Sequence, residues 1–228
     1  MLAHAGIASR RQGGDLIERG EVKVDGRVVR EKGFRVDPSE QKVSVGGKII
    51  QEEKKYYFLL NKPVGVVSTV KDAHAKKKIT DFFWDIDARL YPVGRLDKDT
   101  TGLIIITNDG TLTNLLAHPR YEIDKEYEVR AKPPVEDKDL KNLEKGLLLE
   151  DGKTTPCIIK KIRQTAEEGL YSINLHEGRN RQIRRMFGAL GSKVIGLKRV
   201  KYAGLTLKGL PEGEYRELTE KEVEKLKE

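Results

Sequence analysis

Two carboxylates and an arginine stand in a short glycine-bounded segment whose side chains could carry out acid–base or nucleophilic chemistry. Residues 94–102 hold Arg95, Asp97 and Asp99, and the apolar run 103–106 follows directly. Such a run predicts a buried strand. A loop that leads into a rigid strand holds a carboxylate at fixed geometry, as a catalytic acid or nucleophile requires. Asp97 is the leading candidate. The alternative is that both aspartates only form the turn, because aspartate often bonds its own backbone in loops.

A second segment, 177–187, combines basic side chains with an apolar stripe. Its apolar residues recur at helical spacing, at Ile183, Met186, Phe187 and Leu190. This spacing predicts a helix that packs one face on a sheet. At about 100° per residue, Arg181 and Arg185 should point toward solvent, and Arg184 should lie at the edge of the stripe. A half-buried arginine needs an anionic partner, and Asp97 would suit. The alternative is a weak surface pair with any nearby glutamate.

The chain is basic, and its positive charge is concentrated. It has 44 Lys and Arg against 36 Asp and Glu, a net charge of +8. Residues 176–201 alone contain eight Lys or Arg and a single acid, Glu177, which leaves +7. A polyphosphate backbone selects for charge of this kind. A solvated helix face is the alternative, but such a face usually contains interspersed acids. The distribution therefore favours a nucleic acid as the partner.

Length and composition indicate two units in a soluble, cytoplasmic protein. A chain of 228 residues has room for one good core and a small appended module. Hydrophobic residues make up 37% of it, and no apolar stretch approaches the roughly 20 residues that span a bilayer. No signal segment opens the chain, and Cys157 is the only cysteine, so no intrachain disulfide can form.

Residues 1–50 predict a small helix-plus-hairpin module. Ser9 and Gln12 have the spacing of a capping box, and Gly20 is placed to end a helix over 9–19. Alternating apolar residues flank two pairs of turn residues, at 25–26 and at 46–47, which predicts two hairpins. The charge-rich stretch 51–55 looks like a linker.

Residues 55–228 predict a larger α+β domain, with a mixed, mainly antiparallel sheet flanked by helices. Apolar runs predict strands over 57–60, 64–67, 103–106, 127–129, 158–162 and 170–175. Composition and caps predict helices over 111–118, 135–145 and 219–228.

Four sequence blocks, taken in order, resemble the ribosomal RNA pseudouridine synthases of the RsuA and RluB type. They are residues 61–65 (NKPVG), 94–97 (GRLD), 125–127 (KEY) and 178–186 (GRNRQIRRM). The first fifty residues are similar to the small RNA-binding module, named after a ribosomal small-subunit protein, that precedes the catalytic domain in most members. Members usually begin with a further helical stretch, so the first helix is expected to be shortened here. The motif at 107–120 is closer to the RluB-like branch, which implies large-subunit RNA.

The resemblance implies roles for individual residues. Asp97 corresponds to the essential catalytic carboxylate, and Arg184 to the arginine that pairs with it. Tyr127 corresponds to the aromatic residue that stacks under the target base and is a proposed base. Without the resemblance, Tyr127 would be read as an ordinary strand aromatic. Lys62, Lys125 and Arg95 are candidates for phosphate contact or for support of the loop. Further arginines and lysines are expected to hold the RNA backbone: Arg179, Arg181 and Arg185 on the helix, and Arg10, Arg11, Lys23, Arg27 and Arg30 in the module.

The implied reaction isomerises a uridine in ribosomal RNA to pseudouridine. The bond from the ring nitrogen to the ribose breaks, the base turns, and it is rejoined through carbon. A base stacked in RNA must be extruded to reach the carboxylate. This chemistry needs no metal and no cofactor. The histidines, His4, His74, His118 and His176, lack the spacing of metal ligands.

Two other functions use the same residues. One is a non-catalytic RNA-binding or ribosome-assembly protein, for which the Asp97→Asn variant would keep every activity. The other is a metal-dependent phosphodiesterase in which Asp97 and Asp99 hold magnesium. Neither explains the blocks that contain Tyr127 and Arg184. The family leads us to expect a monomer.

Overall fold

The computed structural model describes residues 1–70 and 75–228, and it begins with a small helix-plus-sheet unit. Helix α1 (Arg10–Glu18) accompanies four short antiparallel strands in the order β2-β1-β3-β4. These strands are β1 (Val22–Val24), β2 (Arg27–Val28), β3 (Val43–Val45) and β4 (Lys48–Ile49). The Ser9 side chain accepts from the Gln12 amide, and the Gln12 side chain accepts from the Ser9 amide. The capping box and both hairpins are therefore confirmed.

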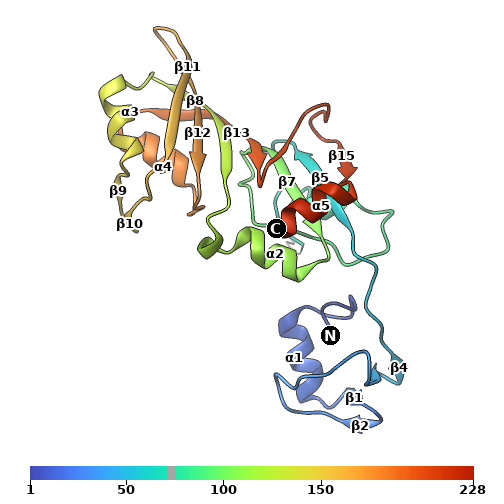
Figure 1. The fold of residues 1–228 in the computed structure, drawn as a ribbon. Coiled ribbons are helices and arrows are strands. Elements are labelled where there is room, and N and C mark those ends of the chain that lie inside the picture. The colour runs from blue at the N-terminus through green and yellow to red at the C-terminus, as the bar shows by residue number, and fades with distance from the viewer. Residues whose placement is uncertain (71–74) are drawn as a thin grey trace.

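A stretch without regular structure separates this unit from the rest of the chain, and Figure 1 shows the unit lying apart from the larger sheet. Strand β4 ends at Ile49, and the next strand begins at Tyr57. The Glu53 amide donates to the His4 carbonyl at 3.2 Å. The Asn108 amide group donates to Glu53 Oε2 at 3.2 Å and to the Lys54 carbonyl at 2.8 Å. Asn108 thus ties the linker to the larger domain.

The larger domain is built on a nine-stranded mixed sheet, so the predicted α+β fold is confirmed. Its main path is β11-β12-β8-β13-β7-β5-β15, with β14 beside β13 and β6 beside β7. The pairing of β13 with β7 is parallel, and the other pairings described in this sheet are antiparallel. The strands are β5 (Tyr57–Lys62), β6 (Tyr91–Pro92), β7 (Thr101–Thr107), β8 (Lys125–Lys132), β11 (Ile158–Gln164), β12 (Gly169–Leu175), β13 (Lys193–Tyr202), β14 (Leu205–Thr206) and β15 (Tyr215–Glu217).

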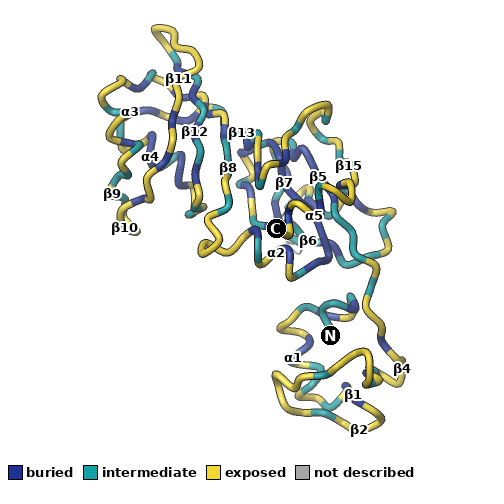
Figure 2. The backbone as a smooth tube through the Cα atoms, viewed as in Figure 1, coloured by how far each residue is buried: buried dark blue, intermediate teal, exposed yellow. Residues whose placement is uncertain are grey.

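Helices cover both faces of this sheet. They are α2 (Gly110–Ala117), α3 (Asp137–Glu144), α4 (Gln182–Ala189) and α5 (Glu220–Lys227), with 3-10 turns at Ile79–Phe82 and Pro119–Tyr121 and a small hairpin of β9 (Leu148–Leu149) and β10 (Gly152–Lys153). Leu103 and Ile105 pack in the cluster that contains residues of α2 and α5, and Ile104 and Ile106 pack on the other side. The continuous apolar run 103–106 is therefore a strand buried on both faces (Figure 2).

Three expectations about local structure need correction. The predicted strand over 64–67 is a turn, in which Gly65 has φ +87° and only Val67 makes an isolated bridge, to Lys78. The helix predicted over 177–187 begins only at Gln182, because Arg181 adopts a left-handed conformation. Strand β13 was not predicted. It contains Lys193, Lys198, Arg199 and Lys201, so the stretch was read as a charged surface, but Val194, Leu197, Arg199 and Tyr202 are buried and it forms a strand of the sheet.

Candidate active site

The loop before β7 is held in place by a second loop that follows β5. Ser68 Oγ donates to the Leu96 carbonyl at 2.8 Å and accepts from the Leu96 amide at 3.2 Å. The Gly65 amide donates to the Lys98 carbonyl at 2.8 Å. The turn closes through the Thr100 amide, which donates to the Asp97 carbonyl. Leu96 is buried, and its side chain anchors the loop. The side chain of Asp97, the next residue, is half-buried and therefore partly accessible.

Lys62 holds the loop that follows β5 in place. Its side chain is fully buried, and Nζ donates to the carbonyls of Pro63 and Val66, both at 2.9 Å. Burial lowers the pKa of Lys62 to about 8, although Asp99 and Asp97 oppose this shift. Of the two roles considered for Lys62, these contacts match support of the loop.

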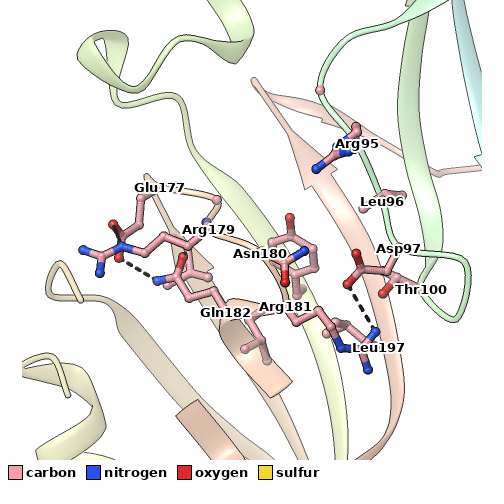
Figure 3. Close-up of a pocket in the computed structure, with 15 residues that line it drawn as sticks. Arg95, Leu96, Asp97, Thr100, Glu177, Arg179, Asn180, Arg181, Gln182 and Leu197 are labelled. Atoms are coloured by element: carbon pink, nitrogen blue, oxygen red, sulfur yellow. Dashed lines mark hydrogen bonds and ion pairs between the residues drawn. The ribbon is translucent and has the colours of Figure 1, made fainter. Parts of the chain in front are cut away.

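A pocket of about 280 Å³ opens beside Asp97. Asp97 and Arg95 line it from the loop, Tyr127 from β8, Leu197 from β13, and residues 177–183 from the segment around the start of α4 (Figure 3). Tyr127 pairs with Arg199 on β13 and with Ile173 on β12. Its backbone is therefore held by a strand on each side, which fixes the place from which its ring extends. The structure therefore brings Asp97 and Tyr127 into one cavity.

The arginine beside Asp97 is Arg181, whereas the sequence led us to expect Arg184. Nη1 of Arg181 lies 3.8 Å from Oδ2 of Asp97 (Figure 3), and its guanidinium also bonds Asp99. Nη2 of Arg184 lies 3.2 Å from Oδ2 of Asp99 and donates to the Asp99 carbonyl at 2.9 Å. The expected Arg184–Asp97 pairing is thus not the one found. Arg181 is exposed, as predicted, but it has a left-handed backbone and its side chain also contacts the carboxylates of the loop, which the sequence did not predict.

Asp99 was treated as a turn residue or a metal ligand, but it contacts two guanidinium groups. Partial burial opposes its ionisation, yet the hydrogen bond from Arg181 and the charge of Arg184 hold the pKa of Asp99 below its usual range. These positive neighbours disfavour a magnesium ion at Asp99. Within residues 1–70 and 75–228, no group of three or more His, Cys, Asp and Glu could hold a metal ion, and His74 lies outside the described residues.

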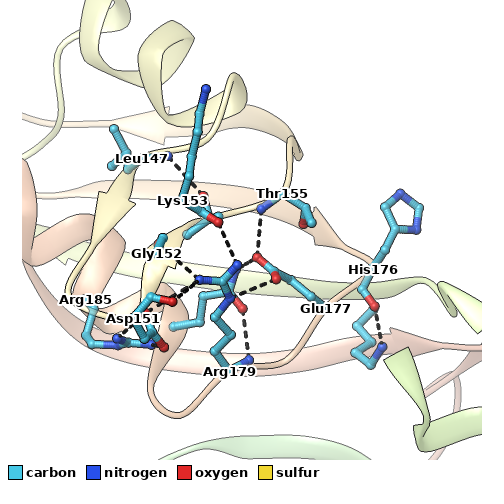
Figure 4. A network of polar contacts seen from close by, with 12 residues as sticks. Leu147, Asp151, Gly152, Lys153, Thr155, His176, Glu177, Arg179 and Arg185 are labelled. Atoms are coloured by element: carbon cyan, nitrogen blue, oxygen red, sulfur yellow. Dashed lines mark hydrogen bonds and ion pairs between the residues drawn. The ribbon is translucent and has the colours of Figure 1, made fainter. Parts of the chain in front are cut away.

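Arg179 and Arg185, which were expected to bind RNA, make internal contacts with the β9–β10 hairpin (Figure 4). Arg179 donates to the carbonyls of Asp151, Gly152 and Lys153. Arg185 forms two hydrogen bonds of 2.9 Å with the Asp151 carboxylate, so it does not point freely into solvent. These two arginines fasten the hairpin beside the pocket.

Glu177 is a further site residue that the sequence analysis passed over. Its carboxylate accepts from Arg179 Nε at 3.0 Å, from the Gln182 side chain at 2.6 Å and from the Thr155 amide at 2.9 Å. It is the single acid in the basic stretch 176–201, and that isolation was the available signal. Glu177 fixes the segment that leads into α4.

The other expected RNA-binding residues differ in their surroundings. Arg95 is exposed at the pocket. Lys125 donates to the carbonyls of Ile123 and His176, and burial lowers its pKa to about 8. In the small unit, Arg10, Arg11, Lys23 and Arg27 are exposed. Arg30 donates to the Glu18 carbonyl, which joins the hairpin to the end of α1.

These features define a class of protein. Residues 56–189 match the family described as RNA pseudouridylate synthase, and residues 1–42 match the S4 domain. The chain belongs to the RNA pseudouridylate synthase family, and its catalytic domain follows an RNA-binding S4 domain. The resemblance drawn from the four sequence blocks is confirmed. No helix in the described parts of the chain is long and apolar enough to cross a membrane.

Individual relatives are similar to this chain over nearly its whole length. The chain is 49% identical over 231 residues to "Ribosomal large subunit pseudouridine synthase B" of Bacillus subtilis (strain 168), an alignment that covers 100% of this chain and 93% of that protein. It is 38% identical to the protein of the same description from Escherichia coli (strain K12), over 96% of this chain and 77% of that one. A solved structure described as a pseudouridylate synthase superposes with a TM-score of 0.72 at 33% identity, over 99% of this chain and 96% of that one.

Proposed function

We propose that this enzyme converts a specific uridine in large-subunit ribosomal RNA to pseudouridine. The observation that carries the proposal is the pocket that brings together Asp97, Tyr127 and the 177–183 segment and that three arginines help to line. The full-length similarity to two proteins described as large-subunit synthases supports the choice of RNA. A protein that acts on ribosomal RNA works where ribosomes assemble, so we also propose a cytoplasmic location. A monomeric state is proposed with it, from the family resemblance alone.

Asp97 is proposed as the catalytic carboxylate. Its side chain is 35% exposed, so one face is open to a nucleotide, while the backbone bonds of Leu96, Lys98 and Thr100 hold the loop around it. In the proposed reaction the carboxylate acts as the nucleophile while the bond between the uracil nitrogen and the ribose carbon breaks. The detached base turns, a carbon–carbon bond to the ribose forms as the carboxylate departs, the proton on that ring carbon leaves, and the freed ring nitrogen takes up a proton. The carboxylate is regenerated, so no group is gained or lost overall.

Tyr127 is proposed to stack on the extruded base and to accept the proton. Its residue is only 9% exposed, and the buried sheet beneath it makes the ring a rigid platform. Base extrusion costs a few kcal/mol of unstacking, which contacts of this kind offset. Arg181 and Arg184 are proposed to act together in positioning the two aspartates of the loop. The S4 domain, proposed as residues 1–50, would add RNA affinity to the catalytic domain, proposed as 55–228.

The test is tritium release from unmodified large-subunit ribosomal RNA that carries tritium at carbon five of uracil. Wild-type protein and the Asp97→Asn and Asp87→Asn variants are compared, because Asp87 is an exposed aspartate outside the pocket. We expect release by wild type and Asp87→Asn, and none by Asp97→Asn. Binding without release by any of the three would instead support an assembly protein. Equal release by Asp97→Asn and wild type would remove Asp97 from the mechanism.

A further inference from the structure

A groove of about 1410 Å³ lies between the S4 domain and the catalytic domain. We call it the interdomain groove, and its basic side chains are Arg10, Arg11 and His4 from the S4 domain and Arg89, Arg120 and His118 from the catalytic domain. Among the residues that the structure describes, no aspartate or glutamate lines it, although the chain contains 36 of them. The groove is therefore positive along both walls.

The four arginines of the groove differ from those near the active site in their partners. Arg179, Arg181, Arg184 and Arg185 all form ion pairs with carboxylates. Within the described residues, none of Arg10, Arg11, Arg89 and Arg120 makes an ion pair. Arg89 lies over the ring of Tyr91, and Arg120 lies over the ring of Tyr121 and donates to its hydroxyl. An arginine without a carboxylate partner retains its full charge toward an incoming anion. The groove arginines therefore keep a positive charge that carboxylates offset for the four arginines near the active site.

Neutral donors complete the wall formed by helix α2. Thr111 and Asn114 line the groove beside the arginines and are exposed, whereas the Thr113 hydroxyl, which also lines it, donates to the Asp109 carbonyl at 2.8 Å. Hydroxyl and amide groups of this kind also bond phosphate oxygens, and such contacts carry no preference for a base. The mixture of arginines and neutral donors fits a sugar–phosphate backbone.

The groove lies away from the pocket, at the opposite end of β7. The loop that holds Asp97 precedes β7, and α2 follows that strand. Seven residues of strand span about 20 Å, so a nucleotide in the groove is not the nucleotide in the pocket. Figure 1 shows the S4 domain below α2, at the end of the molecule away from the tip of the β11–β12 hairpin.

We propose that the interdomain groove binds the phosphate backbone of RNA that flanks the target uridine. This inference rests on the proposed function for the identity of the RNA. The catalytic domain then contributes its own RNA-binding surface through Arg89 and Arg120, in addition to that of the S4 domain. The groove strengthens binding of a long RNA without touching the reacting base.

The test compares two double variants of the full chain with wild type. Arg89→Gln/Arg120→Gln removes the catalytic-domain side of the groove, so the general RNA affinity of the S4 domain does not explain its effect. Lys160→Gln/Arg163→Gln is the control, with the same loss of charge on exposed residues of β11. The dissociation constant for transcribed large-subunit ribosomal RNA is measured from 50 to 300 mM salt, and thermal unfolding establishes that each variant is folded.

For Arg89→Gln/Arg120→Gln we expect at least about tenfold weaker binding near 100 mM salt, and a salt slope that is smaller by about 1.4 to 1.8, since each phosphate contact contributes roughly 0.7 to 0.9. The control should keep both the wild-type slope and the wild-type kcat at saturating RNA. A wild-type slope for the groove variant, or an equal loss in the control, would overturn the proposal. Binding requires no turnover, so absence of tritium release by wild type would reject the proposed function while leaving the groove result to stand.

Discussion

The guanidinium of Arg184 is bound to Asp99, through the carboxylate at 3.2 Å and the main-chain carbonyl at 2.9 Å. The same guanidinium donates to the Val194 carbonyl on β13 at 3.0 Å. One side chain thus joins α4, β13 and the loop that holds Asp97. Arg181 approaches the same carboxylate of Asp99 from the start of the helix. Asp99 is the residue on which both arginines converge, two positions after the proposed catalytic carboxylate.

Replacing Asp99 should therefore disturb the positions of the two arginines while leaving the proposed catalytic carboxylate, Asp97, in the site. In Asp99→Asn the side chain keeps its shape but loses the charge that holds two guanidinium groups. We expect kcat to fall by about 10- to 100-fold, because displacement of a catalytic group by about 1 Å has effects of this size. Tritium release under saturating RNA measures it, with Asp87→Asn as the charge-matched control. Wild-type turnover by Asp99→Asn would show that the arginines need no anchor.

Arg184→Lys tests the three-way contact. An ammonium concentrates its donors at one point and cannot reach Val194 and both acceptors of Asp99 together. We expect roughly 100-fold slower turnover and a loss of about 2 kcal/mol in the free energy of unfolding. Urea denaturation and single-turnover kinetics separate the two effects. Full activity in a folded Arg184→Lys protein would contradict the positioning role.

The proposed roles of the Tyr127 ring and of its hydroxyl can be tested separately. Tyr127→Phe keeps the stacking face, so the KM for RNA should change less than about twofold, whereas kcat should fall by about 100-fold or more if the hydroxyl accepts the proton. Tyr127→Leu removes the face as well, and stacking of one base is worth about 1–3 kcal/mol, so RNA binding should also weaken. Steady-state kinetics on both variants decide the matter. A Phe variant as fast as wild type would leave stacking as the only role.

Gly102 is required by the close approach of two strands. It has φ +104°, and a Cβ atom there would lie 2.2 Å from the Arg199 carbonyl oxygen on β13, the strand that pairs with β7 in parallel. Gly102→Ala should destabilise the protein by about 3 kcal/mol or more. Gly188 in α4 has open space around its Cα, so Gly188→Ala should be neutral or stabilising by up to about 1 kcal/mol. Chemical denaturation of the two variants measures their free energies of unfolding. Equal values would show that β7 and β13 can move apart to accept the Cβ atom without loss of stability.

Lys62 should make stability depend on pH in the alkaline range. Its pKa is about 8 in the folded protein, below the value of 10.5 expected for the unfolded chain. Between these values the unfolded chain binds more protons, so the free energy of unfolding attributable to Lys62 increases as pH rises. Below pH 8 both states are protonated and this increment is absent. In Lys62→Met the increment should be missing, and parallel stability curves for the two proteins from pH 7.5 to 10 would contradict the shifted pKa.

Local features of this protein were determined by sequence alone. The capping box at Ser9 and the hairpin glycines act within a few residues, and the run 103–106 is apolar enough to demand burial on both faces. The loop of Asp97 is likewise defined by its glycines and by the strand after it. The family resemblance could be read because its blocks are contiguous in the chain.

Which charged side chains form ion pairs could be seen only in the tertiary structure. Arg181 turns toward Asp99 because its backbone adopts φ +47°, a conformation that helical periodicity does not anticipate. Parallel pairing of β13 with β7 then brings residues more than eighty positions apart into contact. The sequence left Lys62 as a candidate for phosphate contact or for support of the loop, and its burial under the loop over 63–66 is visible only in the structure. Side-chain spacing predicts which face of an element is apolar, whereas partner choice among several arginines and carboxylates depends on distances that only packing sets.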